Sequence, residues 1–205
     1  MRLTECLKKS LSEEKTLNNI NVFERMNLGA HGNSGMVVTN VGEPTDGIDI
    51  LRKHSNKDKY HAELLGFNSR LDEIQAAILR VKLRYLDKWT EARRQIACRY
   101  NKSLKNLPSI TPFESQSVYH IYHQYTIRSK ERDKLISFLK EAGIMTMVYY
   151  PVPIHLQRVF SFLGYREGDF IEAEKASKEV LSLPIFPELK SNQLLIIKSV
   201  SKFFK

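Results

Sequence analysis

The sequence predicts an α/β protein in which one long helix joins two parts of the chain. From Leu71 to Tyr100, apolar residues recur at steps of three and four, which is the spacing of a single apolar face on a helix. Further along, residues 118–127 are rich in aromatic and β-branched side chains, and an amphipathic segment and a second apolar run follow. This order favours a strand, a crossover helix and a strand, and hence a small α/β layer.

The composition is that of an ordinary globular protein. The chain has 205 residues, 42% of them hydrophobic and 27% charged, which allows one or two small domains with buried cores. Cys6 and Cys98 provide neither a disulfide framework nor paired zinc ligands, so a reducing compartment is expected. No apolar run is long enough for a signal peptide or a membrane span. We expect a cytoplasmic protein with no membrane segment.

The part before the long helix predicts few regular elements. Residues 1–20 are polar and are interpreted as a leader of unknown order. Three glycines then precede a short apolar run, so residues 36–39 are predicted to form a buried strand. Residues 42–47 have turn composition, and residues 48–56 suggest a short helix. Because the glycines come before the strand, they do not have the strand, loop and helix order of a phosphate-binding P-loop.

The helix region itself, residues 71–107, carries an anion-binding signal at its start. Ser69 is predicted to be the N-cap, with Asp72 completing a capping box, and Pro108 ends the region. Asn68 would then lie at the mouth of the helix, where free backbone amides and the helix dipole favour an anion. By residue type alone, an asparagine in this position is more often a turn residue than a ligand contact.

Much of the net charge of +9 lies on this helix region. Between Ala77 and Lys105 there are nine basic residues against only Asp87 and Glu91. A solvated basic face is the commoner explanation, and attraction of nucleic acid or of a nucleotide diphosphate is the alternative. No nucleic-acid-binding motif accompanies this basic stripe.

The remaining residues predict the small α/β layer. Ser129 is expected to cap a helix that ends at Gly143, and residues 144–150 are expected to return as a strand. Residues 157–163 and 170–181 are predicted helices, and a last helix runs to Phe204. His120 and His123 are three residues apart, so on a strand they would point to opposite faces, and no metal site is expected.

Three spaced motifs resemble one enzyme family. They are Asn27-Leu28-Gly29-Ala30, the string GFNSRLDEIQAAILRVKLRYLDKW from Gly66 to Trp89, and Tyr150-Pro151-Val152-Pro153-Ile154-His155-Leu156-Gln157. In this order they resemble the C-terminal portion of the DegT/StrS family of pyridoxal-phosphate (PLP)-dependent nucleotide-sugar aminotransferases. The resemblance implies an aspartate-aminotransferase-like fold with a leader (1–20), a remnant of the large cofactor domain (21–70), a long connecting helix region (71–107) and a nearly complete small C-terminal α/β domain (108–205).

The family's chemistry depends on a lysine that this chain lacks. The resemblance implies transfer of an amino group from glutamate to a nucleotide-linked keto-sugar, in the synthesis of cell-surface polysaccharides or deoxyaminosugars. The family's Schiff-base lysine immediately precedes the Asn-Leu-Gly-Ala string, and Met26 stands at that position. A thioether cannot form an imine, and the nearest lysines, Lys15 and Lys53, lie on other predicted segments. We therefore expect no catalytic residue in this chain and no covalent attachment of PLP.

The same resemblance implies binding roles for four other residues. Asn68 matches the asparagine that reaches the cofactor phosphate held by the other subunit of a dimer. Tyr150, His155 and Gln157 match a loop near the sugar-substrate pocket, although Tyr149 stands where histidine is usual. With equal weight, these three side chains could only hold the loop against the sheet.

Three interpretations of function remain open at this point. The preferred one is a truncated relative of a nucleotide-sugar aminotransferase that is inactive alone, a pseudoenzyme. The alternative is a non-catalytic partner that forms a homo- or hetero-dimer with an aminotransferase-like subunit and supplies Asn68. A nucleic-acid-binding module is the third and least favoured.

Overall fold

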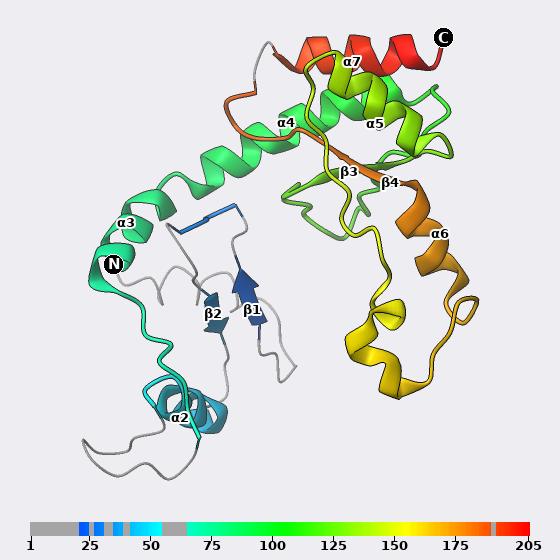
Figure 1. Cartoon of the computed structure of the whole chain (residues 1–205). Helices are drawn as coiled ribbons and strands as arrows, with labels where there is room; N and C mark the ends of the chain where they lie inside the picture. Colours follow the sequence, from blue (N-terminus) through cyan, green and yellow to red (C-terminus); the bar gives the residue numbers. More distant parts are fainter. Residues whose placement is uncertain (1–20, 25–26, 31–34, 39–41, 55–64, 190–191) are drawn as a thin grey trace. The chain divides into compact units, whose positions relative to one another are not determined.

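The computed structural model describes residues 21–24, 27–30, 35–38, 42–54, 65–189 and 192–205. The chain divides into two compact units, Met1–Leu86 and Asp87–Lys205, whose elements are labelled in Figure 1. The expected leader, residues 1–20, and Met26 lie outside the described residues. The domain boundaries predicted at residues 70 and 107 stay predictions.

The described part of the first unit contains a pair of antiparallel strands and two helices. Strands β1 (Asn21–Glu24) and β2 (Gly35–Val38) pair antiparallel, and β2 corresponds to the strand predicted at residues 36–39. Helix α2 spans Gly42–Leu51, so the prediction of a turn at residues 42–47 was wrong. Pro44 is compatible with this helix because the first four amide groups of a helix have no intrahelical partner, and proline lacks only that donor.

The single helix predicted over residues 71–107 is two helices. Helix α3 spans Glu73–Leu83 and α4 spans Leu86–Leu104. Between them, the amides of Arg84 and Tyr85 donate to carbonyls three residues back, at 3.2 and 3.0 Å, so the four-residue hydrogen-bond ladder stops. Neither glycine nor proline marks the break, which explains why the sequence pattern did not predict it. The N-cap of α3 is Asp72 and not the predicted Ser69.

The second unit is a small layered α/β fold. Strands β3 (Tyr125–Arg128) and β4 (Val180–Leu183) pair antiparallel, with Ile127 opposite Leu181. Single bridges extend this sheet on both sides, from Ile110 to Arg128 and from Met147 to Ser182. The other elements of the unit are α4, α5 (Arg132–Glu141), α6 (Ile171–Glu179), α7 (Asn192–Phe203) and two 3-10 helices, η1 (Ile154–Leu156) and η2 (Arg158–Leu163).

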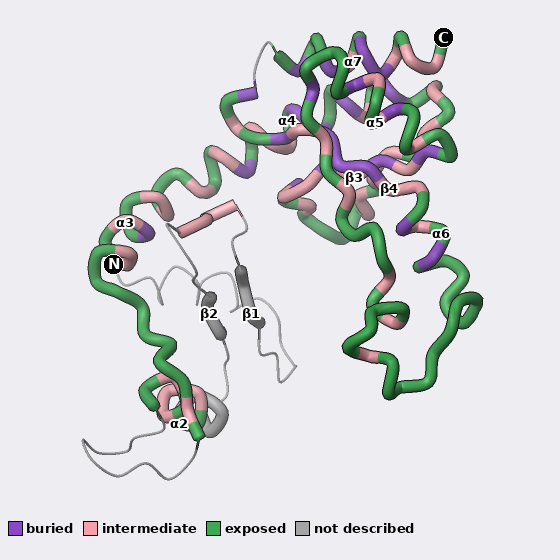
Figure 2. Tube along the Cα trace, in the orientation of Figure 1, coloured by how far each residue is buried: buried purple, intermediate pink, exposed green. Residues whose placement is uncertain are grey.

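The hydrophobic core of the second unit lies between the β3–β4 pair and helices α4, α5 and α7. Alternate residues of β3, Tyr125 and Ile127, are fully buried, as the two-residue period of a strand requires. Figure 2 shows that the buried positions gather on these elements. The core residues are Ile96, Ala97, Tyr100, Leu104, Tyr122, Tyr125, Ile127, Leu135, Leu139, Ile144, Leu181, Leu183, Ile185, Leu189, Ile196 and Val200.

Three predictions in this unit were wrong in extent. The strand expected at residues 118–127 begins only at Tyr125, because Tyr122 has a left-handed φ of +43° that an extended strand cannot contain. Residues 144–150 contribute one bridge, and β4 lies between it and β3, so the predicted crossover does not join neighbouring strands. The helix expected at residues 170–181 ends at Glu179, where β4 follows directly.

The end of α5 is as predicted. Gly143 has a φ of +74°, and the amide of Ile144 donates to the carbonyl of Leu139 at 2.8 Å, which is the hydrogen bond of a Schellman C-cap. At the other end the prediction was wrong: the N-cap of α5 is Glu131 and not Ser129, and it makes no side-chain capping bond. The Ser129 hydroxyl accepts from the amide of Glu131 at 3.2 Å, before the helix begins at Arg132.

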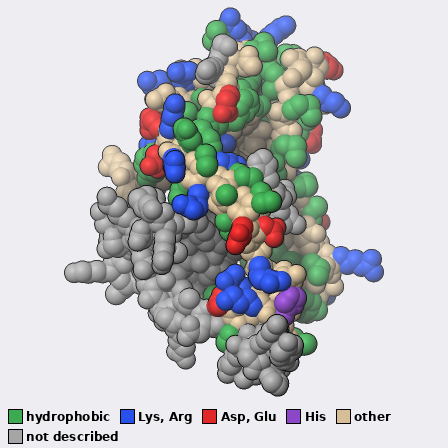
Figure 3. Space-filling model, turned by 90° about the vertical axis from the view of Figure 1, so that its left-hand side faces the viewer, with side chains coloured by type: hydrophobic (Ala, Val, Ile, Leu, Met, Phe, Trp, Pro, Cys, Tyr) green, Lys and Arg blue, Asp and Glu red, His purple; other side chains and the backbone are tan. Residues whose placement is uncertain are grey.

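The basic stripe is less uniform than its sequence suggests. Four of its nine cations donate to protein acceptors. Lys82 donates to the carbonyl of Gly29, Arg93 to that of Ile185, Arg94 to that of His120, and Arg99 to the side-chain oxygen of Gln193. Figure 3 shows Lys and Arg side chains interspersed with hydrophobic and acidic ones on the face that it presents. Among the described helices, none combines the length and the apolar character needed to cross a membrane.

Candidate functional site

Asn68 lies on an extended segment of the first unit and not at a helix terminus. Its backbone forms an antiparallel bridge with Lys53, and the flanking amides of Phe67 and Ser69 donate to the carbonyls of Leu51 and Arg52 at 2.7 and 2.9 Å. Because α3 begins only at Glu73, the expected placement of Asn68 at the mouth of a helix was wrong. The segment is nevertheless fixed by backbone hydrogen bonds, and the Asn68 side chain is exposed.

The segment that follows Met26 is held by an amine that sequence reasoning missed. The Nζ of Lys82, on α3, donates to the carbonyl of Gly29, although the two residues are 53 positions apart in the sequence. The amine of Lys53 is held instead by Asp49, 2.5 Å from its carboxylate. A periodicity argument assigns Lys82 only to a helix face, so nothing in the sequence indicated this contact.

The residues of this segment do not fit a covalently bound PLP. Position 26 carries a methionine. Two described lysines of the first unit, Lys53 and Lys82, donate to protein oxygens. Imine formation requires a free primary amine aimed at the cofactor. We therefore derive no chemical step through this cofactor.

The second unit brings two of the three predicted substrate residues to one cavity. A hollow of about 570 Å³ lies beside the proline-bounded loop, residues 150–157, and both Tyr150 and His155 line it. Gln157 does not line it; its side-chain amide donates to the carbonyl of Val152 at 3.5 Å. Most of the remaining wall is apolar, from η2, α6 and the connection between them.

His155 is paired with an acid that the sequence analysis did not single out. Its Nε2 lies 3.0 Å from Oε1 of Glu174 on α6, and both side chains are nearly buried. The same carboxylate accepts from the amides of Gly168, at 2.9 Å, and Phe170, at 3.3 Å. Glu174 and Ser177, three residues apart, are the buried residues of α6, but a charged and a polar side chain form no apolar pattern that could have marked Glu174 in the sequence.

The environment of Glu174 favours its charged form. Burial alone would raise the pKa of the Glu174 carboxyl, but the hydrogen bonds from Gly168, His155 and Phe170 outweigh it and hold the pKa below its ordinary value. The Glu174 carboxylate contacts His155, the amide of Gly168 and the amide of Phe170. These contacts fix the loop against α6. These contacts support the structural alternative for His155, whereas Tyr150 remains exposed to the cavity.

The two histidines of residues 118–127 do not converge. The Nδ1 of His120 accepts from the amide of Tyr122 at 2.9 Å, and His123 lines a different cavity. Because this segment is not a strand, the argument that placed them on opposite faces was wrong in its premise. Within the described residues, no group of three His, Cys, Asp or Glu side chains is arranged to hold a metal ion.

Comparisons with known proteins agree with the motifs. The profile of the DegT/DnrJ/EryC1/StrS aminotransferase family matches residues 20–201. The chain is 49% identical over 201 residues to a pleiotropic regulatory protein of Geobacillus stearothermophilus, covering 96% of this chain and 54% of that protein. It is 41% identical over 170 residues to the dTDP-3-amino-3,4,6-trideoxy-alpha-D-glucose transaminase of Streptomyces venezuelae, covering 82% and 45%.

A solved structure shows the same fold. The crystal structure of Streptomyces venezuelae DesV in complex with a ketimine intermediate matches with a TM-score of 0.87 and 36% identity, over 93% of this chain and 53% of that one. The chain thus spans about half the length of the relatives that it matches. These findings confirm the predicted fold class.

Aminotransferases of this family depend on PLP and are generally dimers. The motifs at residues 27–30, 66–89 and 150–157 all fall within the matched region. The chain belongs to the DegT/DnrJ/EryC1/StrS aminotransferase family.

Proposed function

We propose that this chain is a nucleotide-sugar aminotransferase relative that does not form the Schiff base and does not transaminate alone. The observation that carries the proposal is Met26, directly before the Asn27-Leu28-Gly29-Ala30 string. The reaction of its active relatives would transfer an amino group from glutamate to a nucleotide-linked keto-sugar. In this chain the second unit would supply the sugar-facing loop.

Substitution by another amine is disfavoured on geometric grounds. A misplacement of about 1 Å can cost about 100-fold in rate, and Lys82 and Lys53 are both engaged with protein oxygens. Of the predicted substrate residues, Tyr150 is the one whose side chain is both exposed and on the cavity wall. His155 and Gln157 would act by shaping the loop that carries it.

The test is reductive trapping of the full chain. The protein is incubated with PLP, reduced with borohydride, and analysed by absorbance and intact mass, with a lysine-bearing family member as the positive control. We expect no adduct that reaches one cofactor per chain. A stoichiometric adduct that peptide mapping assigns to one lysine of this chain would contradict the proposal.

A second candidate function is a partner role for Asn68. Its amide is exposed on a segment that backbone hydrogen bonds fix in place, which suits a contact to another chain's cofactor phosphate. The chain would form a dimer with a lysine-bearing subunit and complete its phosphate site in trans. Within the described residues, the side-chain oxygen of Asn68 accepts a hydrogen bond from Arg70 Nε at 3.3 Å, which leaves the amide NH₂ as the donor for a phosphate.

Co-expression with a lysine-bearing family aminotransferase tests this role. The affinity of the co-purified complex for PLP is compared between the native chain, Asn68→Ala and the exposed control Asn106→Ala. We expect Asn68→Ala alone to weaken cofactor binding. Equal affinities for the two variants, or no stable complex, would remove this function.

A further inference from the structure

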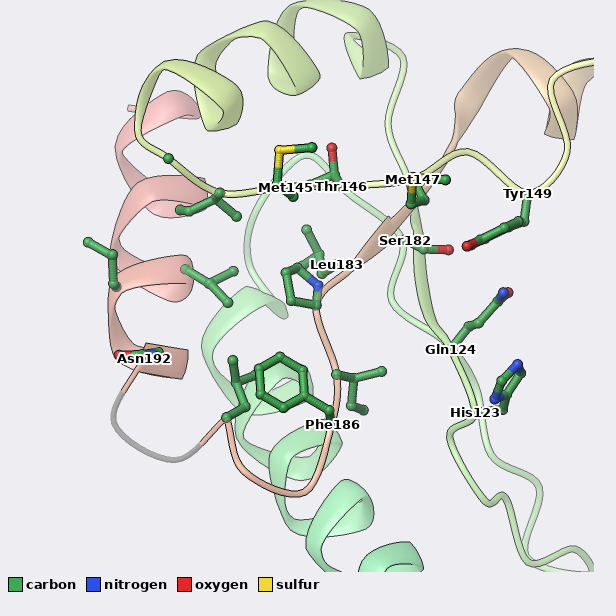
Figure 4. Close-up of a pocket in the computed structure, with 17 residues that line it drawn as sticks. His123, Gln124, Met145, Thr146, Met147, Tyr149, Ser182, Leu183, Phe186 and Asn192 are labelled. Carbon is green, nitrogen blue, oxygen red and sulfur yellow. The ribbon is translucent and has the colours of Figure 1, made fainter. Parts of the chain in front are cut away.

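Two histidines of the second unit line cavities, and their rings are held differently. His123 lines a cavity of about 630 Å³, where Figure 4 shows it beside Gln124. Its Nδ1 is buried without a hydrogen-bond partner among the described residues, so a ligand in that cavity has no access to this nitrogen. His155 lines the cavity beside Tyr150, and its ring is paired with Glu174. The ring nitrogens of His155 are therefore the ones whose chemistry a ligand can meet.

The bond to Glu174 decides which ring nitrogen of His155 carries the proton. Nε2 lies 3.0 Å from Oε1 of Glu174. The same carboxylate accepts from the amide of Gly168, at 2.9 and 3.0 Å to its two oxygens, and from the amide of Phe170 at 3.3 Å. A carboxylate that receives backbone N–H groups stays ionised, and an ionised carboxylate can only accept. Nε2 must therefore carry the proton, because a bare nitrogen would face a bare oxygen.

The proton on Nε2 leaves Nδ1 as an acceptor. A neutral imidazole has one N–H and one bare nitrogen, so the Nδ1 of His155 presents a lone pair. Within the described residues no hydrogen bond reaches this Nδ1, and it is not among the unpaired side-chain atoms that are fully buried. It therefore keeps accessible surface, in contrast to the Nδ1 of His123. Since His155 lines the cavity beside Tyr150, a ligand in that cavity can reach this acceptor.

The imidazole of His155 is also held in its orientation. The ring of Phe170 packs on it with the centroids 4.8 Å apart, and the amide of Phe170 donates to the same carboxylate. The side chains of His155 and Glu174 are 8 and 11% exposed, so water competes little for the bond between them. A flip of the ring would place a C–H group against the carboxylate and lose a charge-assisted hydrogen bond.

The rest of the wall makes the polarity of this one nitrogen matter. No Lys, Arg, Asp or Glu lines the cavity, and most of its lining is aliphatic or aromatic. The hydroxyl of Ser177, which also lines it, is already used, because it donates to the carbonyl of Glu174 at 2.7 Å. Besides His155, only tyrosine hydroxyls remain among the lining side chains to meet a polar group of a ligand.

We propose that Glu174 is a positioning residue that fixes His155 as a hydrogen-bond acceptor on the wall of this cavity. Besides shaping the loop, His155 would then select ligands by the polarity of one group. A ligand hydroxyl or N–H would be accepted at Nδ1, and a carbonyl or phosphate oxygen would be rejected there because two lone pairs would meet. The proposal rests on the proposed function only in that the second unit supplies the ligand-facing loop.

The experiment is nitrogen-15 NMR of the imidazole rings in the full chain, at a pH of about 8, where an ordinary histidine is neutral. Protonated and bare ring nitrogens differ widely in chemical shift, so each ring reports its tautomer. His155→Gln identifies the signals of His155. We expect His155 to have its proton on Nε2 only, and this proton should exchange slowly with water because it is bonded to Glu174.

Glu174→Met removes the acceptor and keeps a side chain of similar length. We expect His155 to become a mixture of both tautomers and its ring proton to exchange about tenfold faster or more, the usual effect of losing a hydrogen bond to a charged group. Glu172→Met, at an exposed position of the same helix, should leave both properties unchanged. His120, whose Nδ1 accepts from the amide of Tyr122, is the internal control and should keep its tautomer in every variant.

Three outcomes would overturn the proposal. They are a bare Nε2 in the His155 ring of the native chain, an unchanged tautomer and exchange rate in Glu174→Met, and an equal change in Glu172→Met. If thermal unfolding shows that Glu174→Met does not fold, the tautomer and the ring-proton exchange of the native chain decide. None of these results depends on Met26, which the borohydride experiment tests separately.

Discussion

The two units of this protein differ in how many of their described apolar side chains are buried. The second unit buries residues from five of its elements and from the connections between them in one core, whereas in the described part of the first unit only Leu79 is buried among the large apolar residues. Leu65, Phe67 and Ile74 of the first unit are 97, 68 and 76% exposed. Buried apolar area is the main favourable term in folding, so the free energy of unfolding is concentrated in the second unit.

Several described apolar side chains of the first unit are exposed. Monomeric proteins rarely leave large contiguous apolar patches uncovered, and aminotransferases of this family are generally dimers. Four pairs of substitutions, three of them with one member in each unit, test the contrast between the units. Trp89, the single tryptophan, lies on α4, so its fluorescence can report the unfolding of the second unit.

The largest effect is expected from truncation in the core of the second unit. Leu139→Ala removes a fully buried side chain of α5 and should lower the free energy of unfolding by about 2–5 kcal/mol. Ile74→Ala on α3 should change it by less than about 0.5 kcal/mol, because Ile74 is exposed. Urea unfolding followed by far-UV circular dichroism, which reports the helices of both units, measures both effects. Equal effects would show that the first unit shares the core's stability.

Two glycine-to-alanine substitutions should change the stability of their own segments in opposite directions. Gly143→Ala forces a methyl group onto a residue with φ of +74°, at a cost of roughly 1–2 kcal/mol. Gly47→Ala lies inside α2, where nothing is within 4 Å of the new Cβ, and alanine favours the helix by up to about 1 kcal/mol. The Trp89 transition should move to lower urea for the first and stay in place for the second. A shift caused by Gly47→Ala would mean that the two units unfold together.

Loss of one buried hydroxyl should have a smaller effect. The hydroxyl of Tyr100 donates to the carbonyl of Pro184 at 2.9 Å, and Tyr100 is fully buried. Tyr100→Phe leaves that carbonyl without this donor and should cost about 1 kcal/mol. Tyr119→Phe, at an exposed position, serves as the control in the same thermal unfolding experiment. If both variants melt alike, the bond to Pro184 contributes nothing measurable.

The smallest effect concerns acid sensitivity. The pKa of Glu174 is lower in the folded chain than its ordinary value of 4.5, so its stabilising contribution is present above that pH and is lost as the pH falls through the lowered pKa. Glu174→Gln should remove this acid dependence from the proline-bounded loop, as measured by amide exchange. Asp49→Asn in the first unit should change little, because the pKa of Asp49, although lowered by Lys53 and Arg52, belongs to an exposed surface pair. If amide exchange in Glu174→Gln keeps the pH dependence of the native chain, a group other than Glu174 causes that dependence.

Most elements of the fold were predictable where the signal was local. The amphipathic repeat from Leu71 to Tyr100 predicted helix correctly, and Gly143 ended α5 as expected. The errors came where tertiary contacts decide the structure. Residues 180–181 were predicted as the end of the helix over residues 170–181, but pairing with β3 makes them part of a strand.

The residues of the candidate site were likewise predictable only in part. That Tyr150 and His155 lie on one loop was predictable from a motif, and both line one cavity. Their role in substrate binding stays a prediction. Glu174 was not predicted, because an acid on a helix carries no sign of the loop amides that it will meet. Gln157 was predicted with the others, yet its backbone joins two 3-10 helices and turns its side chain away from the cavity.

The sequence by itself determined the family and the methionine at position 26, because these depend only on which residue follows which. The tertiary structure alone decided the contact of Lys82 with Gly29, the pairing of His155 with Glu174, and the meeting of His123, Gln124 and Tyr149 at one cavity. The physical reason is that such contacts join residues about 20 to 50 positions apart. They form only when the chain closes on its core, and no local preference encodes that closure.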